Sequence, residues 1–410
     1  MKLEQLSHYG VVQPSRVPAA APRPAGRQRV EGELRKAAGC EVVATHCEPD
    51  HRHGWYSPHG VAGLSGRHLS LICRDPELAY LETANAVFLD TETTGLGLGV
   101  GTYVFLVGAG YVHAGTFQVK QFFLAGPQTE TSFLDELDAF LRQFSAIVTF
   151  NGKAFDWPLL ENRFVLHRRE PPLRDPLHVD LLHPARRLWK RRLESCALSS
   201  LEAHILGVER TEQDVPGYLI PQLYFDYLSG GDRRTLDPVF YHNLQDVLSL
   251  ASLSMHIDRV VGDPHGGAVS HGADYASLGR AYERAGDLDR AMECYEEALH
   301  RLPAGAERRE TLIGLAGLQK RERRWDGAHL CWQQLLDEGG EGALFARVEL
   351  AKYAEHVERD FMQAIDHVQH ALEMAEDRDT TLPGASRRDL EHRLGRLVNR
   401  AVRSRSWVGV

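Results

Sequence analysis

The chain has 410 residues, which is too long for one ordinary hydrophobic core, so the sequence predicts two or three domains. A hydrophobic content of 43% and a charged content of 25% are typical of a soluble globular protein, and no apolar run is long enough to span a membrane. The N-terminus lacks the apolar stretch of a secretory signal, and the six cysteines form no C-x-x-C pair. These features suggest neither a disulfide framework nor a zinc ribbon, and we expect a cytoplasmic protein with reduced thiols.

The net charge of −9 counts mildly against an anionic partner, although the charges are unevenly distributed. Between Arg163 and Arg192 there are nine Lys and Arg residues against three Asp and Glu residues. Because anions respond to the local electrostatic potential, an acidic protein can still present a basic groove. This segment is therefore predicted to attract phosphate groups.

The N-terminal part of the chain divides into two segments. Residues 1–38 are dominated by Pro, Ala and Arg and show no periodic apolar pattern, which predicts a flexible, weakly basic arm. Residues 39–83 are predicted to form short strands and loops that pack against the domain that follows.

Residues 84–261 have the pattern of an α/β domain. Four strands are predicted, at 86–90, 102–112, 116–124 and 146–150, and the first and last of them are predicted to be buried. The second and third are joined around His113-Ala114-Gly115, and residues 129–144 have the apolar spacing of an amphipathic helix. Helical segments dominate from the last strand to about residue 260. This order favours a mixed sheet flanked by helices.

The C-terminal region is predicted to consist of helical repeats. The composition of residues 262–273 is typical of a linker. Small and aromatic residues then follow the spacing of a tetratricopeptide unit, and Ala291, Ala328 and Ala364 lie 37 and 36 residues apart, where paired helices approach closely. One unit cannot bury its apolar face alone, so residues 274–403 are predicted to stack about three units and a capping helix.

Two carboxylates stand at the end of the first predicted strand of the α/β domain, in FLDTETTGLG. Side chains alternate along a strand, so Asp90 and Glu92 are predicted to point to the same side. Two neighbouring carboxylates repel each other unless a cation lies between them, and Mg²⁺ prefers such oxygen ligands. The Thr-Gly pair after them lets the backbone pass close to a bound molecule. The alternative is an exposed acidic turn.

Two further acids follow in chain order. In AIVTFNGKAFDWPLL, a strand ends at Asn151-Gly152 and Asp156 opens a helix, where an acid is also a common N-cap. In FYHNLQDVLSL, Asp246 begins a buried helical stretch in which an unpaired carboxylate is disfavoured. His242 lies one helical turn earlier on the same face, whereas Tyr241 is predicted to project elsewhere. A capping or core histidine is the alternative for His242.

The segment HVDLLHPARRLWKRRL combines an acid with a basic helix. Asp180 ends a predicted strand, where it either orients neighbouring groups or contacts a ligand. In the following helix Arg186 and Lys190 share one face, as do Arg187 and Arg191. The helix is therefore either a solvated charged surface or a surface that contacts phosphates.

The order D-T-E-T-T-G, N-G-K-A-F-D and H-N-L-Q-D resembles the DEDD exonucleases of the ribonuclease-H-like superfamily. The wider stretch, including DLLHPARRLW, CALSSLE and YHNLQDVLSL, is similar to the YprB-type branch, which consists of predicted exonucleases often joined to tetratricopeptide repeats. The resemblance covers about residues 84–260. It implies an α/β ribonuclease-H-like domain, with a mixed sheet flanked by helices, followed by an all-α tetratricopeptide-like repeat domain.

The resemblance also implies a metal site and a substrate. Asp90, Glu92, Asp156 and Asp246 would hold two Mg²⁺ or Mn²⁺ ions, which would activate a water and stabilise the leaving oxygen. The reaction would cut the terminal phosphodiester at the 3′ end of single-stranded DNA or RNA. Substrate contacts are assigned to neighbouring residues, namely Thr91, Thr93, Thr94, Gly95, Asn151, Gly152, Phe155, Asp180, Arg186, Arg187 and Lys190.

The predicted general base departs from the superfamily's pattern. A histidine usually lies five residues before the last aspartate, or a tyrosine four residues before it. Here Tyr241 stands five residues before Asp246 and His242 stands four residues before it. We expect His242 to be the base because an imidazole can accept a proton near neutral pH, with Tyr241 as the alternative.

Several alternatives stay open at this point. The repeats could bind a protein partner while the nuclease-like domain is an inactive scaffold, although the presence of all four acids favours an enzyme. An endonuclease would use the same site. The sequence does not distinguish DNA from RNA, because that choice depends on sugar contacts. Residues 40–59 could also bind zinc, although the spacing of their Cys and His residues fits no standard finger. The donors would be Cys40, His46, Cys47, His51, His53 and His59.

Overall fold

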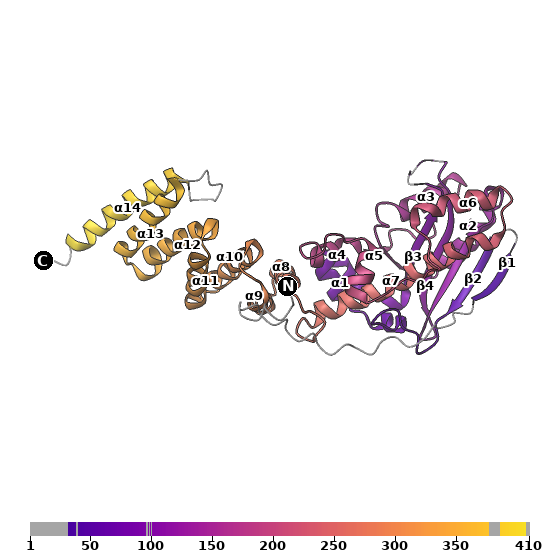
Figure 1. Cartoon of the computed structure of the whole chain (residues 1–410), viewed down its shortest axis with the longest axis horizontal. Helices are drawn as coiled ribbons and strands as arrows, with labels where there is room; N and C mark the ends of the chain where they lie inside the picture. Colours follow the sequence, from indigo (N-terminus) through magenta and orange to yellow (C-terminus); the bar gives the residue numbers. More distant parts are fainter. Residues whose placement is uncertain are drawn as a thin grey trace, which may run out of the picture.

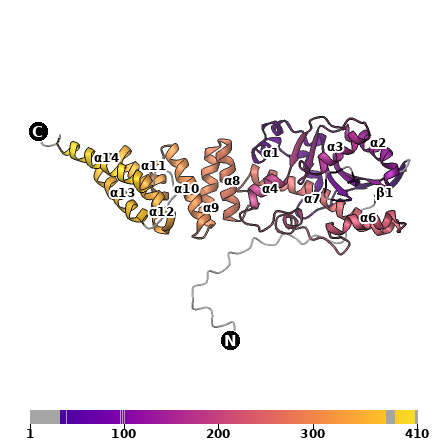
Figure 2. The same cartoon turned by 90° about the horizontal axis from the view of Figure 1, so that it is seen from above.

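The structure is a computed structural model in which residues 32–37, 40–95, 97, 99, 101–376 and 386–406 are described. Figure 1 shows a sheet-containing part at one end of the molecule and a row of helices that extends from it. Figure 2 shows from above that the two parts follow each other along the longest axis. Residues 1–31 of the predicted arm lie outside the described residues.

A seven-stranded mixed sheet forms the centre of the first part, in the order β1-β2-β5-β4-β3-β6-β7. The pairs β3–β6 and β6–β7 are parallel, whereas the other neighbouring strands are antiparallel. The strands are β1 Gly32–Ala37, β2 Cys40–His46, β3 Ala86–Thr93, β4 Val104–His113, β5 Thr116–Leu124, β6 Ala146–Thr149 and β7 Leu177–Asp180. The mixed sheet predicted from the sequence is thereby confirmed.

The N-terminal segments differ from the prediction at two points. The predicted arm extends to about residue 38, but Gly32–Ala37 pair with β2, from Gly32 opposite Thr45 to Ala37 opposite Cys40. GELRKA has no apolar run, and its backbone groups pair with the free edge of β2 whatever the side chains are. The region predicted as short strands and loops also contains the helix α1, Gly66–Cys73.

Helices cover both faces of the sheet. Consecutive residues of β3 point to opposite faces, so their neighbours identify the helices on each face. Phe88 packs in one buried cluster with α1, with α4 Leu182–Trp189 and with α7 Asp237–Gly262. Val87 and Leu89 pack in another cluster with α2 Glu130–Leu141, α3 Asp156–Leu166 and α6 Ile220–Leu228. The remaining helical segments of this part are short: Pro58–Gly63, Pro76–Tyr80, Thr83–Asn85, Pro127–Thr129, α5 Leu198–Leu201, Glu202–Leu206, Gly217–Leu219 and Arg233–Leu236.

Helix α7 lies unusually close to β4 because two residues of that strand have no side chain. A Cβ atom on Gly108 would lie 2.3 Å from Oδ1 of Asn243, and one on Gly110 would lie 2.7 Å from Cγ1 of Val247. Both distances are too short for non-bonded heavy atoms. The two glycines therefore allow α7 to approach the sheet beside β3.

The C-terminal region is entirely helical in its described residues, as predicted. Its helices are α8 Gly272–Ala285, α9 Leu288–Arg301, α10 Ala306–Arg321, α11 Trp325–Glu338, α12 Gly340–Tyr353, a π-turn at Ala354–Glu358, α13 Phe361–Glu376 and α14 Arg387–Ser406. Ala291, Ala328 and Ala364, predicted at close approaches between helices, are fully buried. A Cβ on Gly279 would lie 2.6 Å from the ring of Tyr295, so α8 and α9 also need a small residue at this point.

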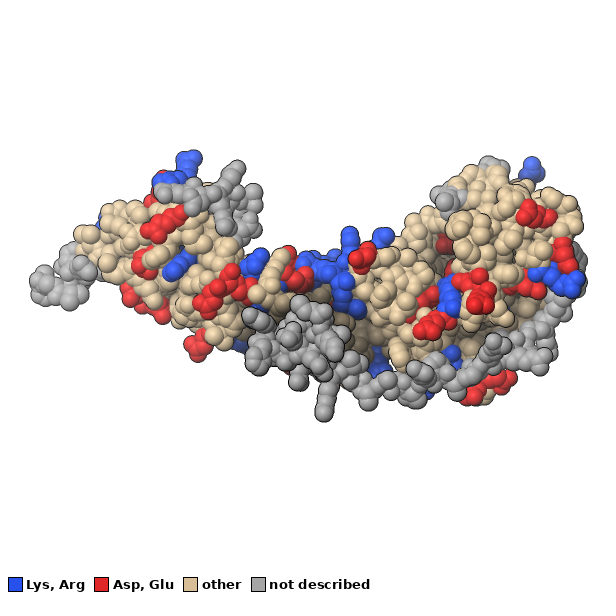
Figure 3. All heavy atoms as spheres, viewed as in Figure 1, with Lys and Arg blue, Asp and Glu red and all other residues tan. Residues whose placement is uncertain are grey.

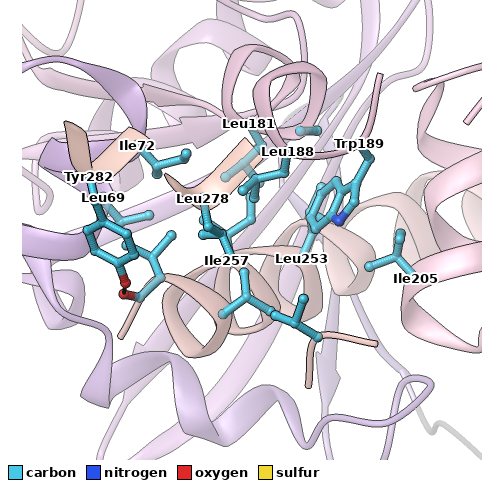
Figure 4. Packing of buried hydrophobic residues seen from close by; sticks show 14 of the residues in the cluster. Leu69, Ile72, Leu181, Leu188, Trp189, Ile205, Leu253, Ile257, Leu278 and Tyr282 are labelled. Carbon is cyan, nitrogen blue, oxygen red and sulfur yellow. Dashed lines mark hydrogen bonds between the residues drawn. The ribbon is translucent and has the colours of Figure 1, made fainter. Parts of the chain in front are cut away.

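The first C-terminal helix is packed into the sheet-containing part. Figure 4 shows Leu278 and Tyr282 of α8 among Leu69 and Ile72 of α1 and residues of α4 and α7. The Tyr282 hydroxyl donates to the backbone oxygen of Val261, at the end of α7. One continuous buried cluster therefore joins the two parts of the molecule.

Candidate active site

Three distant segments bring the predicted acids together at one end of β3. Asp90 and Glu92 lie on β3, Asp156 is the first residue of α3, and Asp246 lies on α7. The Thr91 hydroxyl donates to Oδ1 of Asp156, which links β3 to α3. These contacts and those of α7 define the carboxylate cluster, Asp90, Glu92, Asp156 and Asp246.

Asn243 connects α7 to the acidic strand. Its Nδ2 donates to Oδ2 of Asp90 at 2.8 Å and to the backbone oxygen of Asp90 at 3.2 Å. Gln121 of β5 donates at 2.9 Å to Oδ1 of Asn243, and this fixes which side of the amide faces Asp90. Neither residue was predicted from the sequence, although Asn243 stands directly after His242 in the motif that was used.

The four acids perturb one another electrostatically. Burial raises the pKa of Asp90 well above its usual range, and the charges of Asp246 and Asp156 raise it further. Burial, Asp90, Asp246 and Asp156 likewise raise the pKa of Glu92. Burial raises the pKa of Asp156 to about 6, although the Thr91 hydrogen bond opposes this. Each acid keeps part of its surface accessible, so the cluster lies deep in the protein without being closed.

Arg210 supplies a positive charge to this cluster, and sequence reasoning missed it. Its guanidinium donates to Asp246 and forms a two-point contact with Glu202, at 2.7 Å for each bond. Ser249 of α7 donates at 2.5 Å to the same Glu202. Arg210 therefore balances charge on Asp246 and is itself held by a buried acid, as a buried guanidinium requires.

His242 faces the cluster as predicted, and an acid orients it. Its Nε2 lies 3.6 Å from Oδ2 of Asp246, while its Nδ1 lies 2.7 Å from Oδ1 of Asp214. Nη1 of Arg210 lies 3.1 Å from the same Nδ1, so Asp214 and Arg210 together hold the ring with Nε2 toward Asp246. Tyr241 points elsewhere, and its hydroxyl accepts a hydrogen bond from Thr211 at 3.1 Å. The geometry thus favours His242 over Tyr241 as a base.

Asp180 shapes the turn that leads to Asp156. Its Oδ1 accepts hydrogen bonds from the backbone N–H groups of Asn151 and Leu182, at 2.8 and 3.1 Å. Its Oδ2 accepts one from the backbone N–H of Lys153 at 3.2 Å. With three N–H partners and only 4% exposure, this carboxylate serves to orient neighbouring groups, which was one of the two roles open to it.

The other predicted substrate contacts lie in turns around the cluster. Asn151 is exposed at φ 66°, and a Cβ on Gly152 would lie 2.5 Å from Cβ of Thr149, so that turn needs a glycine. The Thr93 hydroxyl donates to the backbone oxygen of Gly95 at 2.8 Å, and the Thr94 hydroxyl accepts from Tyr103 N–H at 2.9 Å. These hydroxyls shape the turn after β3, while Phe155 is half-buried beside Asp156.

The predicted basic helix α4 has two different kinds of arginine. Arg186 and Lys190 are exposed, as a phosphate-contacting surface requires. Arg187 is turned inward, and its Nη1 donates to the backbone oxygens of Ile72 and Cys73 at 2.7 and 3.0 Å. It therefore caps the C-terminal end of α1, where a positive charge is favourable.

The donor set suits divalent cations, although the side chains are not yet in a coordinating arrangement. Within the described residues, no group of three His, Cys, Asp or Glu side chains is positioned to hold a metal ion. Burial raises the pKa values of Asp90 and Glu92, and the neighbouring acids raise them further, so a cation bound among these carboxylates would stabilise their charged forms. Asp90, Glu92, Asp156 and Asp246 would be the ligands, and Asp246 would have to loosen its contact with Arg210.

Two of the histidines predicted as zinc donors, His53 and His59, make separate hydrogen bonds to other groups. His59 accepts from Phe117 N–H through Nδ1 and contacts the Glu48 backbone oxygen through Nε2, both at 2.9 Å. His53 Nε2 lies 2.6 Å from the Ser249 hydroxyl. This part of the described chain therefore offers no assembled zinc site.

Comparison with known proteins places the chain in a family. Residues 87–257 match the model of the RNase_H superfamily. The chain is 36% identical over 345 residues to "Uncharacterized protein YprB" of Bacillus subtilis (strain 168), which covers 81% of this chain and 80% of that protein. No described helix has the length and apolar character needed to cross a bilayer. The chain thus belongs to the family of this YprB protein and carries a nuclease-like domain of the RNase_H superfamily.

Proposed function

We propose that this protein is a divalent-metal-dependent exonuclease that removes nucleotides from the 3′ end of single-stranded DNA or RNA. The observation that carries the proposal is the convergence of Asp90, Glu92, Asp156 and Asp246 from three segments onto one electrostatically coupled cluster. Mg²⁺ or Mn²⁺ ions bound there would supply Lewis-acid stabilisation of charge on the attacking and leaving oxygens. RNase_H superfamily membership supports this type of chemistry.

The chain's own residues provide the proton transfer and the positioning. His242 Nε2 accepts a proton from the attacking water, and Asp214 at Nδ1 stabilises the imidazolium that results. Water oxygen forms a bond to phosphorus while the bond from phosphorus to the 3′ oxygen of the preceding nucleotide breaks. The leaving oxygen takes a proton from solvent, so the products are a nucleoside 5′-monophosphate and a strand shortened by one nucleotide.

Asp90→Asn is the variant that tests the proposal. Wild type with Mn²⁺ should shorten a 5′-labelled oligonucleotide stepwise, and the variant should lose about 10³-fold in rate because a metal ligand is lost. Its thermal stability without metal should not fall, since one of several repelling carboxylates is removed. Asp135→Asn is the matched control, because that side chain is 63% exposed and forms a surface ion pair with Arg169.

Two other outcomes lead to the alternatives. Nicking of a circular single-stranded substrate would replace the exonuclease with an endonuclease that uses the same cluster. An absence of hydrolysis by wild type with either Mn²⁺ or Mg²⁺ would support a binding scaffold whose C-terminal helices recruit a protein partner. Parallel DNA and RNA substrates decide the sugar preference.

A further inference from the structure

Exposed basic side chains lead from the carboxylate cluster toward the C-terminal helical region. Helix α4 begins two residues after Asp180, whose carboxylate holds the turn before Asp156. Between Leu182 and Arg192 there are five basic residues and no acidic residue. Arg186 and Lys190 are exposed, and neither makes an ion pair within the described part of the chain. Helix α4 therefore carries positive charge away from the acidic site.

The helices beyond α4 separate their charges between two layers. Helices α8 and α10 together carry six basic and four acidic residues, whereas α9 and α11 carry two basic and seven acidic residues. Figure 3 shows Lys and Arg side chains gathered in the depression between the two parts of the molecule, around α4 and α8. The C-terminal helical region as a whole has more acidic than basic residues, so the positive charge around α4 and α8 is a local feature.

A hollow between α8 and α10 continues this positive surface. It has a volume of about 460 Å³, and its lining includes Arg280, Arg284 and Arg321. Arg284 is exposed and has no ion-pair partner among the described residues, whereas Arg280 is held at 3.0 Å by Glu307. The lining also includes Glu310 and Glu283, and Oε1 of Glu283 lies 3.7 Å from Nη2 of Arg321, so within the described chain Arg284 supplies the unpaired positive charge of the hollow.

The connection between α4 and this hollow is fixed rather than hinged. Arg191, two residues after the end of α4, donates to Glu307 and Glu310 of α10 at 2.7 and 2.5 Å. The adjacent Arg192 donates to Asp274 of α8 at 2.9 Å, beside the apolar contacts of Leu278. A ligand that contacts both α4 and the hollow therefore meets a preformed surface, and its binding requires little loss of conformational entropy in the protein.

We propose that Arg186, Lys190, Arg191, Arg280, Arg284 and Arg321, here called the basic saddle, bind the phosphate backbone of a single nucleic acid strand whose 3′ end occupies the carboxylate cluster. The C-terminal helices then act as an extended substrate-binding surface. The direction of the strand rests on the proposed function. Phosphates repeat along a strand, and a linear series of partly unpaired guanidinium and ammonium groups matches that repeat.

An acidic protein segment is the competing occupant, and two observations favour nucleic acid. The basic saddle is continuous with the turn that positions Asp156, through Asp180 and α4. Its exposed members are mainly arginines, which bind phosphate through two parallel hydrogen bonds. Exposed apolar residues, which a protein ligand would normally use as anchors, are absent from the described members of this surface.

The decisive experiment compares oligonucleotides of two lengths in the full chain. We would measure binding of fluorescent single strands of about 4 and about 20 nucleotides, in EDTA to prevent hydrolysis. The double variant Arg284→Glu/Arg321→Glu, at two exposed residues of the hollow, should weaken binding of the longer strand about tenfold and lower the salt dependence of log Kd by about 2. Binding and Mn²⁺-dependent hydrolysis of the shorter strand should stay within about twofold of wild type.

The matched control is Arg174→Glu/Arg234→Glu, which changes the same charge at side chains that are 75% and 84% exposed and lie off the saddle. Equal Kd values for the longer strand in both double variants would overturn the proposal, as would an equal loss for both strand lengths. Polyglutamate could instead displace the strand from wild type and fail to bind the saddle variant. That result would assign the surface to an acidic protein segment.

Failure of the proposed function gives a different result. If wild type binds the longer strand through the saddle but hydrolyses no substrate with metal, the nuclease proposal fails and the binding surface stands. If wild type hydrolyses both strands and the saddle variant is unaffected in either assay, the saddle fails and the nuclease stands.

Discussion

Asp156 is the acid of the cluster that titrates within an experimentally convenient range. Its pKa is raised to about 6 by burial, and burial also raises the pKa values of Asp90 and Glu92 well above their usual ranges. The metal-free fold therefore holds protons that a cation must displace, so Mn²⁺ affinity should rise from about pH 6 to about pH 8. Calorimetric titration in two buffers of different protonation enthalpy would measure the released protons, and Asp156→Asn should release fewer.

The raised pKa of Asp156 also makes the free energy of unfolding of the metal-free protein depend on pH. A raised carboxyl pKa stabilises the fold fully below the ordinary value of 3.8, and this contribution is lost as the pH rises through about 6. His53, His178 and His256 have lowered pKa values, of about 3, 4 and 4, so they stay neutral at pH 6 and above. An Mn²⁺ affinity that is independent of pH, with no proton release, would contradict the prediction.

Residues that form a local pattern could be predicted, whereas those joined only by the fold could not. Asp90 and Glu92 are two apart on a buried strand, and His242 and Asp246 are one helical turn apart, so spacing alone pairs them. Arg210 lies between elements, in a segment without periodicity, and its partner Asp246 is 36 residues away. Nothing in its neighbourhood distinguishes it from an ordinary surface arginine. Asp180 was placed in the right region, but only the three N–H donors around it reveal its role.

At the scale of elements, α4 provides adjacent arginines with opposite roles. Arg187→Ala should lower the free energy of unfolding by about 1.5–3 kcal/mol, because two carbonyls of α1 lose a charged donor. Arg186→Ala should change stability by less than about 0.5 kcal/mol, because the side chain is exposed. Urea denaturation measures both values. Equal losses in the two variants would mean that the contact with α1 contributes nothing.

The elements themselves were predictable to different degrees, for physical reasons. β3 and β4 contain long runs of buried residues and so appear as apolar runs, whereas the first half of β5 alternates between buried apolar and half-buried polar residues. The β4–β5 turn was located at Ala114-Gly115, where both φ angles are positive. β1 was missed because an edge strand is held by backbone pairing with β2 and needs no apolar pattern. The helices α8 to α13 were visible because small residues recur where neighbouring helices touch.

For the whole molecule, the buried junction predicts coupled unfolding of its two parts. Leu278 of α8 is 1% exposed among residues of the sheet-containing part. Leu278→Ala should cost about 2–5 kcal/mol and shift the unfolding of sheet and helices together. Circular dichroism in the near and far ultraviolet would follow the two transitions. Leu330→Ala, at a 60% exposed leucine of α11, is the control, and separate midpoints for sheet and helices would exclude a coupled junction.

The distance between the acids of β3 and the residues of α7 in the candidate site depends on Gly108, which has no side chain of its own. The gap between β4 and α7 is as narrow as a missing methyl permits, and Asn243 crosses it to reach Asp90. Any larger residue would act as a spacer, lifting the histidine and the last acid away from the strand that carries the first two. Transferring this candidate site to another scaffold would accordingly require a glycine at the position of Gly108 along with the acids, because the distance between β4 and α7 sets the distances within the site.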